Sequence, residues 1–315
     1  MKMNGKFWNW VKLAAGVAIV VALMWKLGTN GFVAGLRVID ARDVVAALVI
    51  GLGTTLLCAW RWCLVARRLG LRLPLGKAVA DYYRALFLNA VLPAGVLGDV
   101  QRAVSHGKQE GDVGAGVRAV VLERTAGQAV VMVAGVAVLL ASPARAVGLV
   151  LVAVLVAVAL AYLAARRWVG IGSRWRRTID DVRDGLLARD AWPGVAALSA
   201  AALTGHITLF LIAMKAAGAS QSLDKLLPIV IVALLAMGLP INVGGWGPRE
   251  GVTALMFAAA GLGAAQGLTA AVAYGLLGLV ASLPGALTLV PWARVATHVR
   301  GLVAVVLVRK RERVA

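Results

Sequence analysis

Six ionisable residues lie inside or beside long apolar segments of the sequence. They are Asp99, Arg102, Glu123, Arg124, Arg249 and Glu250. Ionisable groups at membrane depth are costly, so they are rare and usually mark substrate or ion pathways. Two guanidinium groups can clamp a phosphate, because each matches its oxygens with parallel hydrogen bonds. The carboxylates would then hold the arginines in place or accept protons. The alternative is structural ion pairing that satisfies buried charge.

Two of these arginines, Arg102 and Arg249, end similar motifs that interrupt apolar segments. Both motifs read Leu-Pro-x4-Gly-x3-Arg. Proline removes a helix donor and clashes with the preceding turn, and glycine weakens what remains. The motifs therefore predict helix breaks within segments 79–100 and 226–262, each facing protein or a water-filled cavity. The residues that make the breaks are Pro93, Gly95, Gly98, Pro240, Gly244 and Gly245.

An asparagine accompanies each break, Asn89 at the first and Asn242 at the second. Each either contacts substrate or satisfies backbone groups that the break leaves free. The shared motif, with opposite orientations expected from charge, predicts an inverted repeat with halves 79–165 and 226–290. Secondary transporters commonly use such repeats, with the substrate between them and helix N-termini that favour anions.

The composition indicates that the elements that position these residues lie in a lipid bilayer. Of 315 residues, 61% are hydrophobic and 15% are charged, with a mean hydropathy of +0.86. A soluble fold cannot bury so much apolar surface, so we expect one all-α, polytopic membrane domain over 1–315. The net charge of +19 is spread between apolar runs, which favours anchoring on an anionic leaflet over nucleic-acid binding. The tryptophans, Trp62 included, mostly flank these runs and are expected at the interface.

Hydropathy and charge together predict the topology. Arginine and lysine clusters over 61–77, 166–177 and 309–313 are expected in the cytoplasm with both termini, in the inner or plasma membrane. Segment 174–190 fits an amphipathic helix on that face or a solvated linker. The expectation is six full spans plus two re-entrant hairpins, and an eight-span arrangement of shorter helices is the alternative. The six apolar runs cover 10–27, 44–62, 118–141, 145–165, 193–216 and 268–290.

Three stretches together resemble a known family. They are 82–93 with 98–103, Glu123-Arg124-Thr125-Ala126-Gly127, and Leu239-Pro240 with 244–250. They are similar to the transmembrane region of lysylphosphatidylglycerol synthases, a flippase-like membrane family. The resemblance covers nearly the whole chain and implies movement of lipids or lipid-linked intermediates between leaflets. The synthases carry a large soluble aminoacyl-transfer domain that this sequence lacks, so it is not expected to make the lipid. The family motif residues correspond to Asn89, Pro93, Gly98, Asp99, Arg102, Glu123, Arg124, Gly245, Arg249 and Glu250.

The function expected is translocation of an anionic phospholipid or a polyprenyl-phosphate lipid, without catalysis or cofactor. The alternative is a membrane enzyme, with Asp99 or Glu123 as base, or an accessory subunit acting on polyprenyl-linked glycans. The expected protein partner of the chain is a second copy of itself or a biosynthetic enzyme. No metal is expected, because His106 and His206 have no matching ligand set.

Overall fold

Helices form the described part of the chain, and no strand occurs in that part. The computed structural model describes residues 29–92, 95–168, 183, 185–186, 188–238 and 246–289. Four helical segments in these ranges are long and apolar enough to cross a membrane. They are α3 (Ala41–Arg68), α6 (Val113–Leu140), α9 (Trp192–Ala216), and α12 (Ala264–Ser282) continued by α13 (Pro284–Leu287). The expected all-α membrane fold is thereby confirmed.

The first break lies where the motif predicts it. Helix α4 (Leu75–Val91) ends before the motif and α5 (Leu97–Gln109) begins within it. Between them Leu92 is extended, with φ −95° and ψ 145°, and Gly95 has a φ of 59°. A φ of this sign is the left-handed region that glycine tolerates best. The chain therefore cannot continue α4 through this point.

The second break separates α10 (Leu223–Met237) from α11 (Pro248–Ala259). Pro248 occupies the first helical position, where its missing N–H costs nothing. The backbone N–H of Gly247 donates to the Glu250 carboxylate at 2.6 Å. Whether either broken pair re-enters the bilayer stays a prediction. The expected span at 10–27 and most of 174–190 lie outside the described residues.

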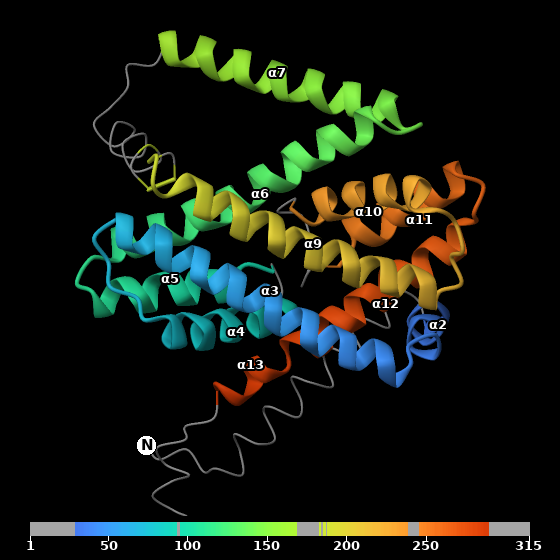
Figure 1. The fold of residues 1–315 in the computed structure, drawn as a ribbon, viewed down its shortest axis with the longest axis horizontal. Coiled ribbons are helices and arrows are strands. Elements are labelled where there is room, and N and C mark those ends of the chain that lie inside the picture. The colour runs from blue at the N-terminus through green and yellow to red at the C-terminus, as the bar shows by residue number, and fades with distance from the viewer. Residues whose placement is uncertain are drawn as a thin grey trace, which may run out of the picture.

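Helices α3 and α9 pack side by side across the bundle, and α6 and α12 complete it (Figure 1). Around these four, α4 contacts α3 and α12, whereas α10 contacts α9 and α6. Each second half-helix then packs on its neighbour in sequence, α5 on α6 and α11 on α12. The largest apolar core lies between α9, α10 and α12, with Phe210, Met214 and Leu277 fully buried. The short helix α2 (Thr29–Arg37) packs against α12.

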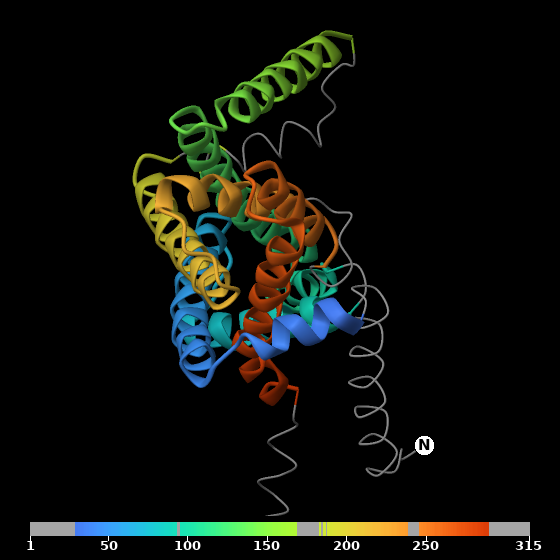
Figure 2. The same cartoon turned by 90° about the vertical axis from the view of Figure 1, so that its right-hand side faces the viewer.

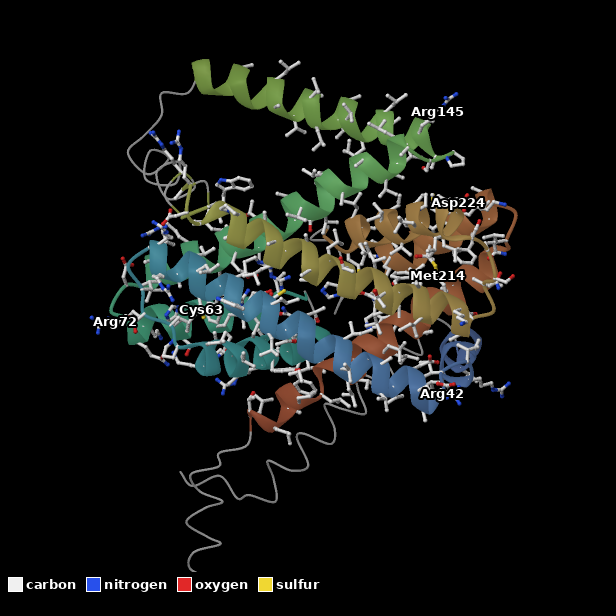
Figure 3. All side chains as sticks on the ribbon, viewed as in Figure 1. Arg42, Cys63, Arg72, Arg145, Met214 and Asp224 are labelled. Atoms are coloured by element: carbon white, nitrogen blue, oxygen red, sulfur yellow. The ribbon has the colours of Figure 1, made fainter. Side chains whose placement is uncertain are left out.

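Helix α7 (Arg145–Trp168) leaves the bundle after its turn with α6 (Figure 2). Several of its apolar side chains are more than half exposed, among them Leu149, Val150 and Val158. In water such a face would be unstable, whereas lipid tails cover it at no cost. At the ends of the helices the charged side chains of Arg42, Arg145 and Asp224 lie at the periphery (Figure 3).

Gly98, in the first turn of α5, permits close contact with α4. A Cβ at this position would lie 2.7 Å from the Ala85 Cα. We therefore expect Gly98→Ala to push α5 away from α4 and to cost about 1–3 kcal/mol, as overpacking does. Thermal unfolding of purified protein in detergent measures the loss. Gly251→Ala, in the first turn of α11, is the control because its Cβ would meet nothing within 4 Å. Equal unfolding temperatures for the two variants would contradict this account.

Candidate functional site

A fully buried carboxylate, Glu123 on α6, joins two helices through their arginines. Its Oε1 accepts from Arg61 of α3, with Nε at 3.1 Å and a second bond from Nη2. Its Oε2 accepts from Arg102 Nη2 of α5 at 2.7 Å. The Tyr82 hydroxyl on α4 lies 3.3 Å from Oε1. A buried carboxylate is tolerated only when such partners replace its water.

Arg102 has no exposed surface and is enclosed on every side. Its Nε donates to Asp99 Oδ1 at 2.9 Å, one helical turn earlier. Its guanidinium carbon lies 4.7 Å from the ring centroid of Trp62 and 4.4 Å from that of Tyr82. Cation–π contact of this kind is strongest where water is excluded. The side chain is therefore fixed by two carboxylates and two rings.

Asp99 links the buried network to the first break. Its Oδ2 accepts from Asn89 Nδ2 at 2.8 Å and from Arg124. The Asn89 Oδ1 accepts from the backbone N–H of Gly98 at 2.7 Å. This N–H is one of the free donors at the start of α5. Asn89 thus satisfies backbone that the break exposes, which is one of its two predicted roles, and it also orients Asp99.

The network carries a surplus positive charge. Three guanidinium groups, those of Arg61, Arg102 and Arg124, meet the two carboxylates Asp99 and Glu123. The Arg124 side chain is 49% exposed, whereas Arg102 is fully buried. The surplus therefore faces outward at Arg124. An uncompensated charge in a low-dielectric setting favours binding of an anion.

Arg124 lines a cavity of about 720 Å³ inside the bundle. Arg61, Asp99 and Ser199 also line it, and Arg61 Nη1 donates to the Ser199 hydroxyl at 2.9 Å. Helices α3, α4, α5, α6, α9, α10 and α12 all contribute to its wall. The volume lies within the range of pockets that hold small molecules.

Part of the cavity wall is formed by apolar residues of α5, α6 and the residue before α5. Four valines there line the cavity and are also exposed at the protein surface. They are Val96, Val100, Val117 and Val121. In a bilayer an apolar rim of this kind contacts acyl chains rather than water.

The second broken segment supplies a separate buried pair, Arg249 and Glu250. Arg249 Nε donates to Glu250 Oε1 at 2.9 Å. Its guanidinium carbon lies 5.0 Å from the Trp246 ring centroid and 5.1 Å from that of Tyr274. Tyr274 lines the cavity, and its hydroxyl lies 3.4 Å from His206 Nδ1. Arg249 thus contacts Tyr274, a residue of the cavity wall, without being one of the described residues that line the cavity.

A family model described as the lysylphosphatidylglycerol synthase TM region matches residues 9–285. The chain belongs to this family. No curated protein matches the sequence. Membership of a membrane family whose name refers to a phospholipid fits the helical fold and the cavity, and the resemblance seen in the sequence is confirmed. Membership by itself assigns no substrate to this chain.

The structure brings five of the predicted site residues into one network, because Asn89 also bonds Asp99, and it leaves two apart. The first group consists of Asn89, Asp99, Arg102, Glu123 and Arg124, and the second of Arg249 and Glu250. Among the described residues lining the cavity are Asp99 and Arg124, but neither Arg102 nor Arg249. The remaining predicted residues Asn242, Pro93, Pro240, Gly244 and Gly245 lie outside the described residues.

Two residues have roles that differ from those expected. Positive-inside counting places Arg61 in a cytoplasmic basic cluster, yet it is 5% exposed and paired with Glu123. Trp62 is expected at the interface, yet it is fully buried beside Arg102. The signal that identifies Arg61 is its position one turn after Cys58 and two after Thr54, on a face of α3 that is buried. The positive-inside rule counts the lysines and arginines of a segment and does not consider which face of the helix each one occupies.

Replacing Glu123 tests whether this carboxylate holds the network together. We expect Glu123→Gln to leave Arg61 and Arg102 without adequate charge compensation and to cost about 3–5 kcal/mol. The matched control is Asp190→Asn, which removes the partner of Arg68 in an ion pair that is 69% exposed on the carboxylate side. Such a surface pair contributes less than about 1 kcal/mol. A Glu123→Gln protein that unfolds at the temperature of the parent would contradict this role.

Proposed function

We propose that the protein translocates an anionic lipid, or a lipid-linked intermediate, between the leaflets of its membrane. The observation that carries the proposal is the surplus positive charge of the buried network, which faces a cavity with an apolar rim. The family of the chain agrees with a lipid-related function. A single surplus charge matches the single negative charge of a phosphodiester.

Arg124 and Arg61 are the groups we assign to the phosphate. Both line the cavity, and Arg124 keeps half of its side chain exposed while it pairs with Asp99. Bidentate guanidinium contacts would bind the phosphate oxygens. Neither Arg102 nor Arg249 is among the described residues that line the cavity, so we assign both to support of the cavity wall. In this proposal Arg124 and Arg61 replace Arg102 and Arg249, the pair of arginines that the two motifs predict as the phosphate clamp.

The carboxylates have a supporting role in this proposal. Asp99 accepts from Arg102, Arg124 and Asn89, and Glu123 accepts from Arg61, Arg102 and Tyr82. A general base needs a lone pair directed at its substrate and a pKa near the working pH. Carboxylates bonded to two guanidinium groups are poor candidates. This favours a transporter over the enzyme alternative.

Arg124→Gln tests the anion site in liposomes that contain the purified protein. We expect at least a tenfold slower appearance of an acyl-labelled phosphatidylglycerol in the opposite leaflet, because a charge-assisted bond contributes about 1.5–3 kcal/mol. Bleaching of the outer-leaflet label by dithionite measures the rate. Arg42→Gln, at an exposed position at the start of α3, is the control. Parental rates in Arg124→Gln would exclude Arg124 from the transport path.

The valine rim gives a second test of the same proposal. Val121→Trp adds bulk at an exposed residue of α6 that lines the cavity, so we expect transport to slow severalfold. Val133→Trp is a matched control on the same helix, because Val133 is 71% exposed and does not line the cavity. The same dithionite assay measures both variants. Similar rates for the two would show that lipids do not pass this rim.

A further inference from the structure

His206 on α9 lies on the helix face that points into the bundle. Ser199, Leu203 and Phe210 share this face by their helical spacing, and all three are buried. His206 is instead exposed, because it borders the cavity. An ionisable side chain at membrane depth that is open to an interior cavity points to an ion or proton pathway.

His206 is also the lining side chain whose charge changes most readily near neutral pH. Arginine stays protonated, and cysteine and tyrosine ordinarily lose their protons only above neutral pH. Asp99 accepts from two guanidinium groups, which favour its charged form. The titratable residues that line the cavity in the described part of the chain, besides His206, are Cys58, Arg61, Tyr82, Asp99, Arg124 and Tyr274.

The charges around His206 come from the helices packed on α9, which are α3, α6, α10 and α12. On α10 the described residues that line the cavity include no titratable group. Lys215 of α9 and Asp224 and Lys225 of α10 are exposed at helix ends. The other helices bring Cys58 and Arg61 of α3, Glu123 and Arg124 of α6, and Tyr274 of α12 toward the cavity. With Asp99 and Arg102 of α5, these groups carry the one surplus positive charge of the network.

The contact between His206 and Tyr274 accommodates both protonation states of the imidazole. The Tyr274 hydroxyl lies 3.4 Å from His206 Nδ1. A hydroxyl can donate to a neutral ring nitrogen and can accept from a protonated one. The Tyr274 ring is held by stacking on Phe210, with a centroid distance of 4.4 Å, and the charges of Arg249 and Glu250 behind it cancel. His206 can therefore gain or lose a proton and keep this partner.

The distance between His206 and the arginines is short enough to couple their charges. Ser199, which bonds Arg61, lies two turns before His206 on α9, a rise of about 10 Å. At an effective dielectric constant of about 20, two unit charges about 10 Å apart change the affinity for a proton about tenfold. In the empty cavity the surplus charge thus opposes protonation of His206. A phosphodiester bound at Arg61 and Arg124 cancels that charge and removes the opposition.

We infer that His206 carries one proton with each anionic lipid, so that the protein is a lipid–proton symporter. The inference rests on the proposed function and names its coupling ion. If lipid binding strengthens proton binding about tenfold, the proton strengthens lipid binding by the same factor. The proton adds to a ring nitrogen of His206 from water on one side of the membrane and leaves to water on the other side. The phosphodiester and the proton together carry no net charge, so a pH gradient drives the transport and the membrane potential does not.

A pH gradient across liposomes that contain the purified full chain tests the symport. Acyl-labelled phosphatidylglycerol is added with the outside more acidic by one pH unit, while valinomycin and equal potassium concentrations hold the potential at zero. We expect the label to approach an excess of about tenfold in the inner leaflet, because the proton gradient is itself tenfold. Bleaching by dithionite after return to a common pH measures the distribution, and liposomes without protein are the blank.

Two variants assign the proton to His206. His206→Gln and His206→Asn keep a polar side chain that cannot become charged, so the label should distribute evenly under the same gradient. Having two such replacements guards against one that does not fold. Thr208→Val on α9 is the control and should keep the excess, because the Thr208 hydroxyl bonds the Thr204 carbonyl of its own helix.

The distribution and the movement of the label separate the outcomes. Movement with an even distribution in the parent overturns the symport and leaves the translocation intact. An excess that persists in either His206 variant overturns the assignment of the proton to His206. No movement in the parent, with or without the gradient, overturns the proposed function itself.

Discussion

The carboxylate of Glu123 is the contact on which the candidate site depends. It lies in a fully buried position and bonds guanidinium groups from α3 and α5 and a phenol from α4. Removing a carboxylate from water costs several kcal/mol, which only close, well-directed partners offset. Because those partners come from three helices, satisfying one charge fixes how the three helices pack on α6. The need to pair the Glu123 carboxylate therefore also determines how these helices pack.

The helix break extends that constraint to the cavity. Asn89, at the end of α4, accepts from the first turn of α5 and donates to Asp99. Asp99 in turn bonds Arg102 inside the network and Arg124 at the cavity surface. A continuous helix would leave no free backbone N–H for Asn89 to accept from. The interruption thus places an acidic residue between a buried arginine and a half-exposed one.

Two kinds of arginine occur in and near the site: Arg102 and Arg249 are enclosed by protein, whereas Arg124 is exposed to the cavity. Arg102 and Arg249 are each stacked on two aromatic rings and paired with acidic residues, so their charges are largely compensated inside the protein. Arg124 keeps half of its side chain exposed. The surplus charge of the network thus lies beside the cavity, in a chain that belongs to the lysylphosphatidylglycerol synthase TM region family.

The sequence by itself determined the helical membrane fold, the first break and the identity of the ionisable residues that meet there. Those features follow from local quantities, namely hydropathy, proline and glycine positions, and the rarity of charge in apolar segments. The tertiary structure alone decided that Arg61 joins Glu123 across 62 residues, that Arg102 is enclosed, and that His206 and Tyr274 meet at the cavity. Such pairings depend on which helix faces come together in space, and that choice is set by the packing of the whole bundle rather than by any one segment.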